Sequence, residues 1–399
     1  MRVGTSTLGV VVAMVFAANL AQAQVPANIE EGLKKIGQIV DPACTAKLYR
    51  PLMPKNDYNT YWPPDATAPA STTQLYPGIT IARDTSFGPD PKDVIDIFTA
   101  DKGGDNRPVL IYVPGGAGNK IEQQAREGNA FYDNIGRWAT KNGMVGVLIQ
   151  RHPGSGWDDG GRDISKAVDW LTGNVAKYKG DPKRMFIWAH SAGNGPLGVY
   201  VGHADRWPKG VAVKGAVFMS GNPVPGVGGG GRGAGAPGAG RGQGGPGGAP
   251  GGPQAGAACG MTGTALGAEG AIAGPSSARA GGAGGARGAG GGRGGPGQQL
   301  TPEQQAERDN LPGFKATSVK IMLVRAELDP GVTGDMTAAD KALHDELCTL
   351  DGAKAKDGVG HCPAMLFAKG ESHMSEVFSI DTDDKIVSGP ILAWIKKIK

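Results

Sequence analysis

The sequence predicts an α/β fold with a mostly parallel central sheet that is covered by helices on both faces. Short apolar runs typical of buried strands alternate along the chain with amphipathic patterns of ten or more residues. Small turn-forming residues follow several of these runs directly. Once a terminal and a glycine-rich segment are set aside, about 300 residues remain, which suits a single α/β domain.

The first half of the chain supplies the pattern that this class requires. Residues 93–98 alternate apolar and polar side chains, and 108–113 form the continuous apolar run of a buried strand. A helix is expected over 129–141 and the next strand over 144–150. Asp163 predicts the N-cap of a further helix. The apolar face of that helix comprises Ile164, Ala167, Val168 and Leu171.

The second half continues the alternation. Thr301 and Pro302 predict a short helix that starts with a capping residue and a proline at its first position. The other expected elements are a helix over 192–201 and strands over 184–190, 213–219, 319–324 and 364–367. The final helix has an apolar face made of Ile391, Trp394, Ile395 and Ile398.

The N-terminus has the features of a secretory signal peptide. Arg2 supplies the positive start, residues 8–16 the apolar stretch, and Ala21-Gln22-Ala23 a small-x-small cleavage site. We therefore expect cleavage after Ala23 and a secreted or periplasmic protein, with a retained N-terminal anchor helix as the alternative. Other apolar runs are too short to span a bilayer, so no stable membrane anchor is expected.

Residues 226–298 differ in composition from the rest of the chain. They are nearly all Gly, Ala, Pro, Gln and Arg, which cannot bury enough apolar surface to offset the entropy of ordering, so we expect a disordered insert. It divides one α/β domain into 24–225 and 299–399. The insert holds five arginines against Glu269, so the formal net charge of +4 resides largely in it. It has no aromatic residue, and we expect no nucleic-acid partner.

The four cysteines are Cys44, Cys259, Cys348 and Cys362. Export permits disulfides, and four cysteines allow three pairings that sequence alone does not distinguish. We favour Cys348 with Cys362 because they flank one short loop, and a bond between Cys44 and Cys259 is a hypothesis. Their spacing does not resemble a zinc site, and neither a metal nor a cofactor is expected.

Ser191 is the candidate nucleophile. It ends the apolar run 184–190, with Ala189 two residues before it and Gly193 two residues after it. Small residues at these positions allow the sharp strand-to-helix turn that lifts a serine above the edge of a sheet. The serine hydroxyl then needs a general base to accept its proton.

His373 and Asp329 are the candidate base and acid. His373 follows the last predicted strand, and Asp329 follows the strand 319–324, so both fall at the carboxyl edge of the sheet with Ser191. Glu327 is the alternative acid. The order Ser, Asp, His along the chain is the order described for hydrolases with a serine at such a turn.

A glycine-rich turn supplies the candidate oxyanion hole. Val113-Pro114-Gly115-Gly116-Ala117 follows a buried strand, and it lacks the Gly-Lys-Ser/Thr ending of a phosphate-binding loop. The backbone N–H groups of Gly116 and Ala117, with that of Ala192 after the nucleophile, are therefore expected to stabilise an oxyanion.

These motifs together resemble the α/β-hydrolase superfamily. The resemblance is to its esterase/lipase branch, which includes hormone-sensitive-lipase-like carboxylesterases, feruloyl-esterase-like enzymes and arylformamidases. It covers the chain from Asp93 onward except the insert, and it implies the α/β-hydrolase fold and the site residues already given. The matching segments are Asp93-Val94-Ile95-Asp96-Ile97-Phe98, Val113-Pro114-Gly115-Gly116, Gly180-Asp181-Pro182-Lys183-Arg184, His190-Ser191-Ala192-Gly193, Glu327-Leu328-Asp329-Pro330 and His373-Met374-Ser375.

Three departures from the branch stand out. Pro114 occupies the position where the branch usually has the histidine of His-Gly-Gly-Gly, and Ala189 stands where glycine is usual. The disordered insert occupies the position at which some relatives carry a helical cap over the pocket.

The expected function is a secreted serine hydrolase that cleaves a carboxylic ester through an acyl-enzyme on Ser191. The alternatives are an amidase or formamidase, since the triad does not distinguish these bonds, and a non-catalytic binding protein with the same fold. The expected partner is a small-molecule or polymer-linked ester. Its acyl and alcohol specificity and the oligomeric state remain open.

Overall fold

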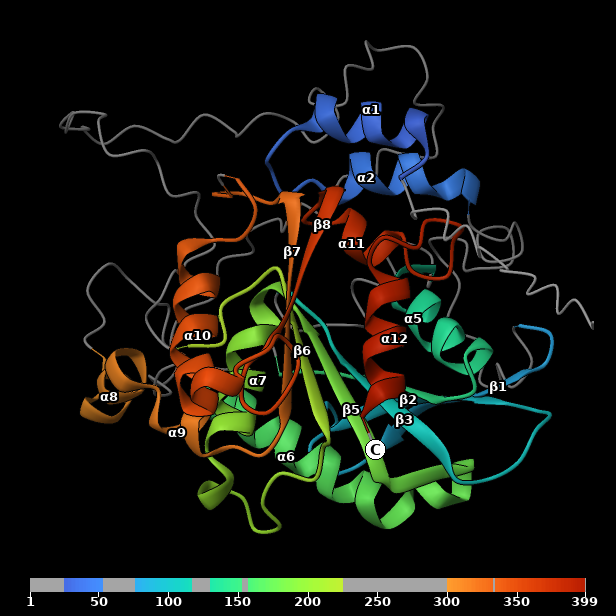
Figure 1. The fold of residues 1–399 in the computed structure, drawn as a ribbon. Coiled ribbons are helices and arrows are strands. Elements are labelled where there is room, and N and C mark those ends of the chain that lie inside the picture. Colours follow the sequence, from blue (N-terminus) through green and yellow to red (C-terminus); the bar gives the residue numbers. More distant parts are fainter. Residues whose placement is uncertain are drawn as a thin grey trace, which may run out of the picture.

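The computed structural model describes residues 25–52, 76–116, 130–152, 157–224, 300–332 and 334–398. Within these ranges the chain forms one eight-stranded sheet with helices on both faces (Figure 1). The predicted α/β class with a mostly parallel sheet is confirmed. The predicted signal peptide, the predicted disordered insert with Cys259, and Ala117 lie outside the described residues.

The sheet has the strand order β1-β2-β4-β3-β5-β6-β7-β8. The pairs β1–β2 and β2–β4 are antiparallel and the remaining pairs are parallel. Because β6 pairs with β7, the segments before and after residues 226–298 build the same sheet. The strands are β1 (Ile79–Ser86), β2 (Val94–Ala100), β3 (Arg107–Val113), β4 (Val145–Ile149), β5 (Gly180–His190), β6 (Gly215–Met219), β7 (Lys320–Leu328) and β8 (Ala364–Ser372).

The helices cover the two faces of this sheet, and α1 lies beside β8 (Figure 1). They are α1 (Ala27–Ile36), α2 (Pro42–Tyr49), α5 (Ala130–Lys141), α6 (Trp157–Asn174), α7 (Asn194–Gly202), α8 (Pro302–Asn310), α9 (Pro312–Ala316), α10 (Ala338–Cys348), α11 (Ser375–Phe378) and α12 (Ser388–Lys397). Short 3₁₀ helices are η1 (Arg50–Leu52), η2 (Val175–Tyr178), η3 (Ser191–Gly193), η4 (Ala204–Arg206) and η5 (Thr349–Lys354).

The side-chain alternation of the strands produces two hydrophobic cores. In β3, Leu110 and Tyr112 belong to one core, and Ile111 belongs to the other. The first core also receives side chains from α1, α5 and α12, and the second from α6, α7 and α10. Successive residues of a strand point to opposite faces, so a strand buried on both faces reads as a continuous apolar run.

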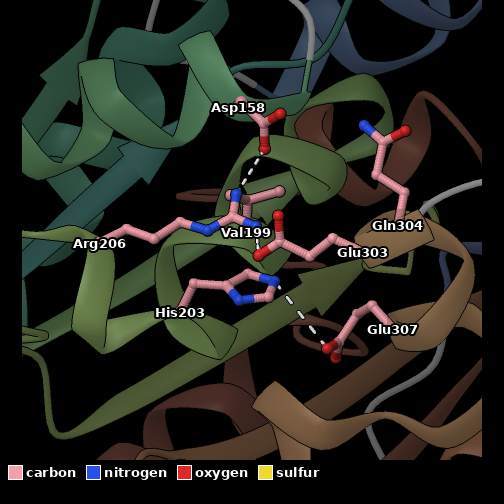
Figure 2. Close-up of a pocket in the computed structure, with 7 residues that line it drawn as sticks. All are labelled: Asp158, Val199, His203, Arg206, Glu303, Gln304 and Glu307. Carbon is pink, nitrogen blue, oxygen red and sulfur yellow. Dashed lines mark hydrogen bonds and ion pairs between the residues drawn. The ribbon is translucent and has the colours of Figure 1, made fainter. Parts of the chain in front are cut away.

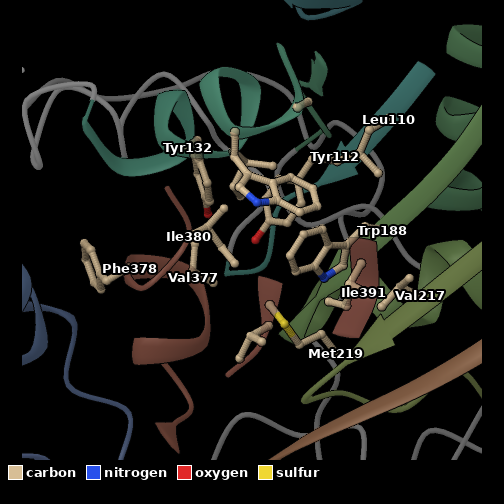
Figure 3. Close-up of a cluster of buried hydrophobic side chains, with 14 of the residues drawn as sticks. Leu110, Tyr112, Tyr132, Trp188, Val217, Met219, Val377, Phe378, Ile380 and Ile391 are labelled. Atoms are coloured by element: carbon tan, nitrogen blue, oxygen red, sulfur yellow. The ribbon is translucent and has the colours of Figure 1, made fainter. Parts of the chain in front are cut away.

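Aromatic side chains fill the centre of the first core (Figure 3). The ring of Tyr112 lies 5.5 Å from that of Tyr132 on α5 and 5.9 Å from that of Trp188 on β5. These centroid distances are typical of favourable aromatic pairs. The packing holds α5 against the strands that lead to the nucleophile.

One predicted helix start is wrong. Helix α6 begins at Trp157, and Asp163 lies inside it rather than at its N-cap. The Asp163 carboxylate instead accepts a hydrogen bond in a tertiary contact with His152. The predicted cap of α8 is confirmed, because Thr301 and Gln304 form a reciprocal capping box with Pro302 in the first turn.

The ends of two strands and three elements in the first part of the chain also differ from the prediction. Strands β7 and β8 run on to Leu328 and Ser372, past polar residues that end the apolar runs. The edge strand β1 and helices α1 and α2 were not predicted.

The favoured disulfide is present between Cys348 and Cys362. Cys44 is also disulfide-bonded. The hypothesis that Cys259 is its partner falls outside the described residues. In the described part of the chain, no helix is both long and apolar enough to cross a membrane.

Candidate active site

Ser191 lies on a sharp turn between a strand and a helix. It follows the last residue of β5 and has a φ of 53°, in the left-handed region that non-glycine residues rarely adopt. A Cβ atom on Gly193 would lie 2.8 Å from the carbonyl oxygen of Val113 and 2.9 Å from that of Pro114. The predicted steric need for a small residue at position 193 is therefore confirmed, and the turn presents the hydroxyl at the carboxyl edge of the sheet.

The structure brings Ser191, His373 and Asp329 together. Nε2 of His373 lies 2.9 Å from Oγ of Ser191, and Nδ1 lies 2.6 Å from Oδ1 of Asp329. Asp329 directly follows β7, and His373 directly follows β8. Because an ionised carboxylate only accepts hydrogen bonds, Nδ1 carries the proton and Nε2 is free to accept one from the serine hydroxyl.

Arg325 holds the carboxylate of Asp329 in place. Its Nη1 donates to Oδ2 of Asp329 at 2.6 Å, and its Nε and Nη2 each donate to Asp340 at 2.9 Å. Asp329 is only 2% exposed, and burial alone would raise its pKa. The hydrogen bond to His373 and the charges of His373 and Arg325 nevertheless hold the pKa of Asp329 below its ordinary value. The carboxyl group is therefore ionised at neutral pH.

Glu327, the alternative acid, makes a different contact. Its Oε2 accepts a hydrogen bond of 2.7 Å from the backbone N–H of Gly370. The nitrogen Nδ1 of His373 faces Asp329 instead. The geometry therefore favours Asp329 as the partner of His373.

His190 is a neighbour of the site that sequence reasoning set aside. Its ring centroid lies 4.7 Å from that of His373, and its Nε2 donates to the carbonyl oxygen of His373 at 2.8 Å. His190 is 2% exposed. Burial and the nearby charge of His373 lower the pKa of His190 to about 3. A neutral His190 thus positions the backbone of the candidate base.

This burial predicts a pH-dependent contribution to stability. The unfolded chain titrates near the ordinary histidine pKa of about 6.5. Between that value and the folded pKa of about 3, the unfolded state binds more protons. The free energy of unfolding therefore falls as the pH drops below about 6.5, and this contribution is fully present above it.

The variant His190→Gln tests this sign, because glutamine keeps an amide donor and does not titrate. Urea unfolding measures the free energy of unfolding of both proteins at about pH 7.5 and about pH 5. The decrease between these two pH values should be about 2 kcal/mol smaller in the variant than in the wild type. An equal fall in both proteins would show that His190 is not held neutral by the fold.

The glycine-rich loop lies against the nucleophile. A Cβ atom on Gly115 would lie 2.8 Å from Cβ of Ser191 and 3.0 Å from the carbonyl oxygen of His190. Gly116 has a φ of 58°, and Ala192 directly follows the serine. Of the three predicted oxyanion donors, Gly116 and Ala192 are described, and Ala117 is outside the described residues.

Arg151 anchors this loop and was also missed by sequence reasoning. Its Nε donates to the carbonyl oxygen of Pro114 at 2.9 Å, and its Nη2 donates to that of Gly116 at 3.2 Å. Arg151 is the second residue after β4, and Arg325 interrupts the apolar run of β7. Both arginines could have been identified from the sequence, because each is a charged residue at or inside a buried strand and a buried charge needs partners.

A small pocket lies between α6, α7, η4 and α8 (Figure 2). Its volume of about 10 Å³ is close to the space that one water molecule needs. None of the three residues Ser191, Asp329 and His373 lines it. The lining residues are Asp158, Val199, His203, Arg206, Glu303, Gln304 and Glu307.

The chain is similar to known esterases over part of its length. The family described as BD-FAE matches residues 95–206. A chlorogenic acid esterase of Aspergillus niger is 27% identical over 127 residues, which are 29% of this chain and 23% of that protein. Secreted lipase 5 of Gibberella zeae is 35% identical over 60 residues, which are 15% of this chain and 11% of that protein. The chain thus spans less than a quarter of the length of these relatives.

A solved structure covers more of the chain. A truncated carbohydrate esterase from gut microbiota is 14% identical, covers 80% of this chain and 95% of its own, and has a TM-score of 0.47.

Proposed function

The chain belongs to the esterase/lipase branch of the α/β-hydrolase superfamily, and from this membership we propose that it is a serine hydrolase that cleaves a carboxylic ester through an acyl-enzyme on Ser191. The observation that carries the proposal is the continuous hydrogen-bonded chain from Ser191 through His373 to Asp329, with distances of 2.9 and 2.6 Å. Such a chain turns a weak hydroxyl nucleophile into a reactive one.

Acylation begins when His373 removes the proton of Ser191. Oγ attacks the ester carbonyl carbon while Nε2 accepts the proton, and Asp329 stabilises the imidazolium that forms. The developing oxyanion accepts hydrogen bonds from the backbone N–H groups of Ala192, Gly116 and Ala117. His373 then gives its proton to the departing alkoxide oxygen, which leaves as an alcohol.

Deacylation repeats these steps with water as the nucleophile. His373 accepts a proton from water as the water oxygen attacks the acyl carbon, and the proton returns to Oγ of Ser191 as the acid product leaves. Arg325 acts through Asp329, because it keeps that carboxylate ionised and oriented toward His373. His190 acts through the backbone of His373.

We assign the proposed enzyme to the periplasm or the exterior of the cell, on the signal-peptide pattern of residues 1–23. The disulfide between Cys348 and Cys362 is consistent with an oxidising compartment. The substrate is a small-molecule or polymer-linked ester. Residues 24–225 and 299–399 act as one catalytic domain that the glycine-rich segment interrupts.

Covalent labelling tests the proposed nucleophile directly. A fluorophosphonate should label the folded protein once, and peptide mapping should place the label on Ser191. The Ser191→Ala variant is the matched control and should not be labelled. Absence of label from the folded wild-type protein would contradict the proposal and favour a non-catalytic binding protein.

A panel of matched aryl esters and anilides separates the ester reaction from the amide alternative. We expect kcat/KM to be higher for each ester than for the anilide with the same acyl group. A preference for the anilides or for formamides would assign the same triad to the amidase alternative.

A further inference from the structure

A second group of polar side chains lies at the same edge of the sheet as Ser191. Asp93 immediately precedes β2, His152 follows β4, and Asp163 lies on α6. Because β2 runs antiparallel to β4, the start of one strand lies beside the end of the other, and Gln150 N–H donates to the carbonyl oxygen of Val94 at 3.0 Å. Residues distant in sequence therefore meet at this corner.

The two ring nitrogens of His152 face carboxylates on opposite sides. Nδ1 lies 2.8 Å from Oδ2 of Asp163. Nε2 lies 3.4 Å from Oδ1 of Asp90 and 3.8 Å from Oδ1 of Asp93. With Nδ1–H donating to Asp163, the lone pair of Nε2 points toward the two other carboxylates.

Asp93 has an unsatisfied oxygen inside this group. The side chain is fully buried, and Oδ1 has no hydrogen-bond partner in the part of the chain that the structure describes. Its other oxygen, Oδ2, accepts from the backbone N–H of Asp90 at 3.3 Å and lies 3.9 Å from Nζ of Lys166. A buried carboxylate oxygen without a partner is costly, so a cation beside Oδ1 would remove a penalty that the fold otherwise carries.

The spacing fits a metal ion. Ligand atoms of Asp93, His152 and Asp163 all lie within 4.8 Å of one another. In a tetrahedral zinc site with bonds near 2.0 Å, neighbouring ligand atoms are about 3.3 Å apart. The distances of 3.4 and 3.8 Å from Nε2 to Asp90 and Asp93 are close to that separation. Asp163 on Nδ1 then completes the carboxylate–histidine–metal arrangement that orients a ligating imidazole.

We propose that Asp90, Asp93 and His152 bind a divalent transition-metal cation of the zinc class, with Asp163 as the residue that positions His152. The imidazole nitrogen favours this class over Ca²⁺ and Mg²⁺, which prefer all-oxygen sites. The cysteine spacings do not predict this site, because its ligands are carboxylates and an imidazole that come from two separate segments, with Asp163 on a third.

The site has a structural role beside the candidate oxyanion loop. His152 follows Arg151, whose guanidinium binds the carbonyl oxygens of Pro114 and Gly116. A metal that joins the segment before β2 to the end of β4 fixes the backbone from which Arg151 extends. The cation therefore stabilises the folded state and takes no part in the hydrolytic steps.

One other group in the described residues could be taken for a metal site. His344 lies near Cys348 and Cys362, but these two cysteines form a disulfide and offer no thiolate. A proton on Nε2 of His152 is the alternative to a metal ion. Burial lowers the pKa of His152, but the hydrogen bonds and charges of Asp163 and Asp90 raise it above the ordinary value.

Calorimetric titration of tag-free, chelator-treated protein with ZnCl₂ at about pH 7.5 tests the proposal. We expect one zinc ion per chain and a higher Tm when zinc is in excess of its Kd. Asp163→Asn should weaken the affinity roughly 10- to 100-fold, and Asp93→Asn and His152→Gln should weaken it at least as much. His152 is 24% exposed in its side chain, so His152→Gln is the variant that disturbs folding least.

Two controls keep the result specific. The control variants are Asp159→Asn and His344→Gln, and both should bind zinc as the wild type does. Asp159 is an exposed residue of α6 that pairs with Arg162 at 2.9 Å. Absence of zinc binding by the wild-type protein would overturn the proposal and leave a proton on His152. Three other results would also overturn the proposal. The first is unchanged zinc affinity in both Asp93→Asn and His152→Gln, and the second is loss of zinc affinity in His344→Gln alone. The third is a Tm that responds to CaCl₂ but not to ZnCl₂.

Discussion

Replacement of Ser191 by alanine is expected to lower kcat for an aryl ester by roughly 10⁴- to 10⁶-fold. The change removes Oγ, which lies 2.9 Å from Nε2 of His373, and leaves no group that can form the acyl-enzyme. Residual hydrolysis above the rate in water would come from the backbone donors and from substrate binding. Steady-state kinetics at neutral pH, with the released phenol as readout, measures the effect.

Ser318→Ala is the matched control. Ser318 is an exposed residue just before the start of β7, at the opposite end of that strand from Asp329. Its replacement should leave kcat unchanged. Retention of activity by Ser191→Ala within tenfold of the wild type would contradict the proposed nucleophile.

Asp329→Asn is expected to lower kcat by about 10⁴-fold while the protein stays folded. Arg325 donates to one oxygen of Asp329 at 2.6 Å, so it will select the amide oxygen of the asparagine. The amide NH₂ group must then face Nδ1 of His373, which becomes the acceptor. The proton moves to Nε2, and His373 can no longer accept the proton of Ser191.

The same kinetic assay with Asp335→Asn supplies the control. Asp335 is an exposed residue of the same connection and pairs with Lys341 at 2.6 Å. It should keep the activity of the wild type. If Asp329→Asn were active and Glu327→Gln inactive, the alternative acid would be the correct one.

The strands were predicted best where both faces of the sheet are covered. The buried strand β3 (Arg107–Val113) reads as an apolar run because its alternate side chains enter two different cores. The edge strand β1 lacks that pattern and was missed. Asp163 was misplaced as an N-cap because its carboxylate contacts His152, a partner that only the folded chain brings near.

The residues that position the candidate catalytic groups were harder to predict from the sequence than the catalytic groups themselves. Arg151 acts on the loop at Pro114 through a hydrogen bond across the fold, and no local spacing encodes that contact. Arg325 lies only four residues before Asp329, but its other hydrogen bonds, to Asp340, become visible only in the folded chain. His190 was set aside because neighbours on a turn point in different directions, yet its ring reaches the backbone of His373.

The order of chemical groups along the chain is thus already present in the amino-acid sequence. A serine after one buried strand, an aspartate after another and a histidine after a third lie at the same edge of the sheet, since parallel strands end there. Which carboxylate contacts His373, what keeps it ionised, and how Asp93 and His152 come together depend on the tertiary structure. Those features are set by distances of a few ångströms between segments that are remote in sequence, and strand periodicity carries no information about them.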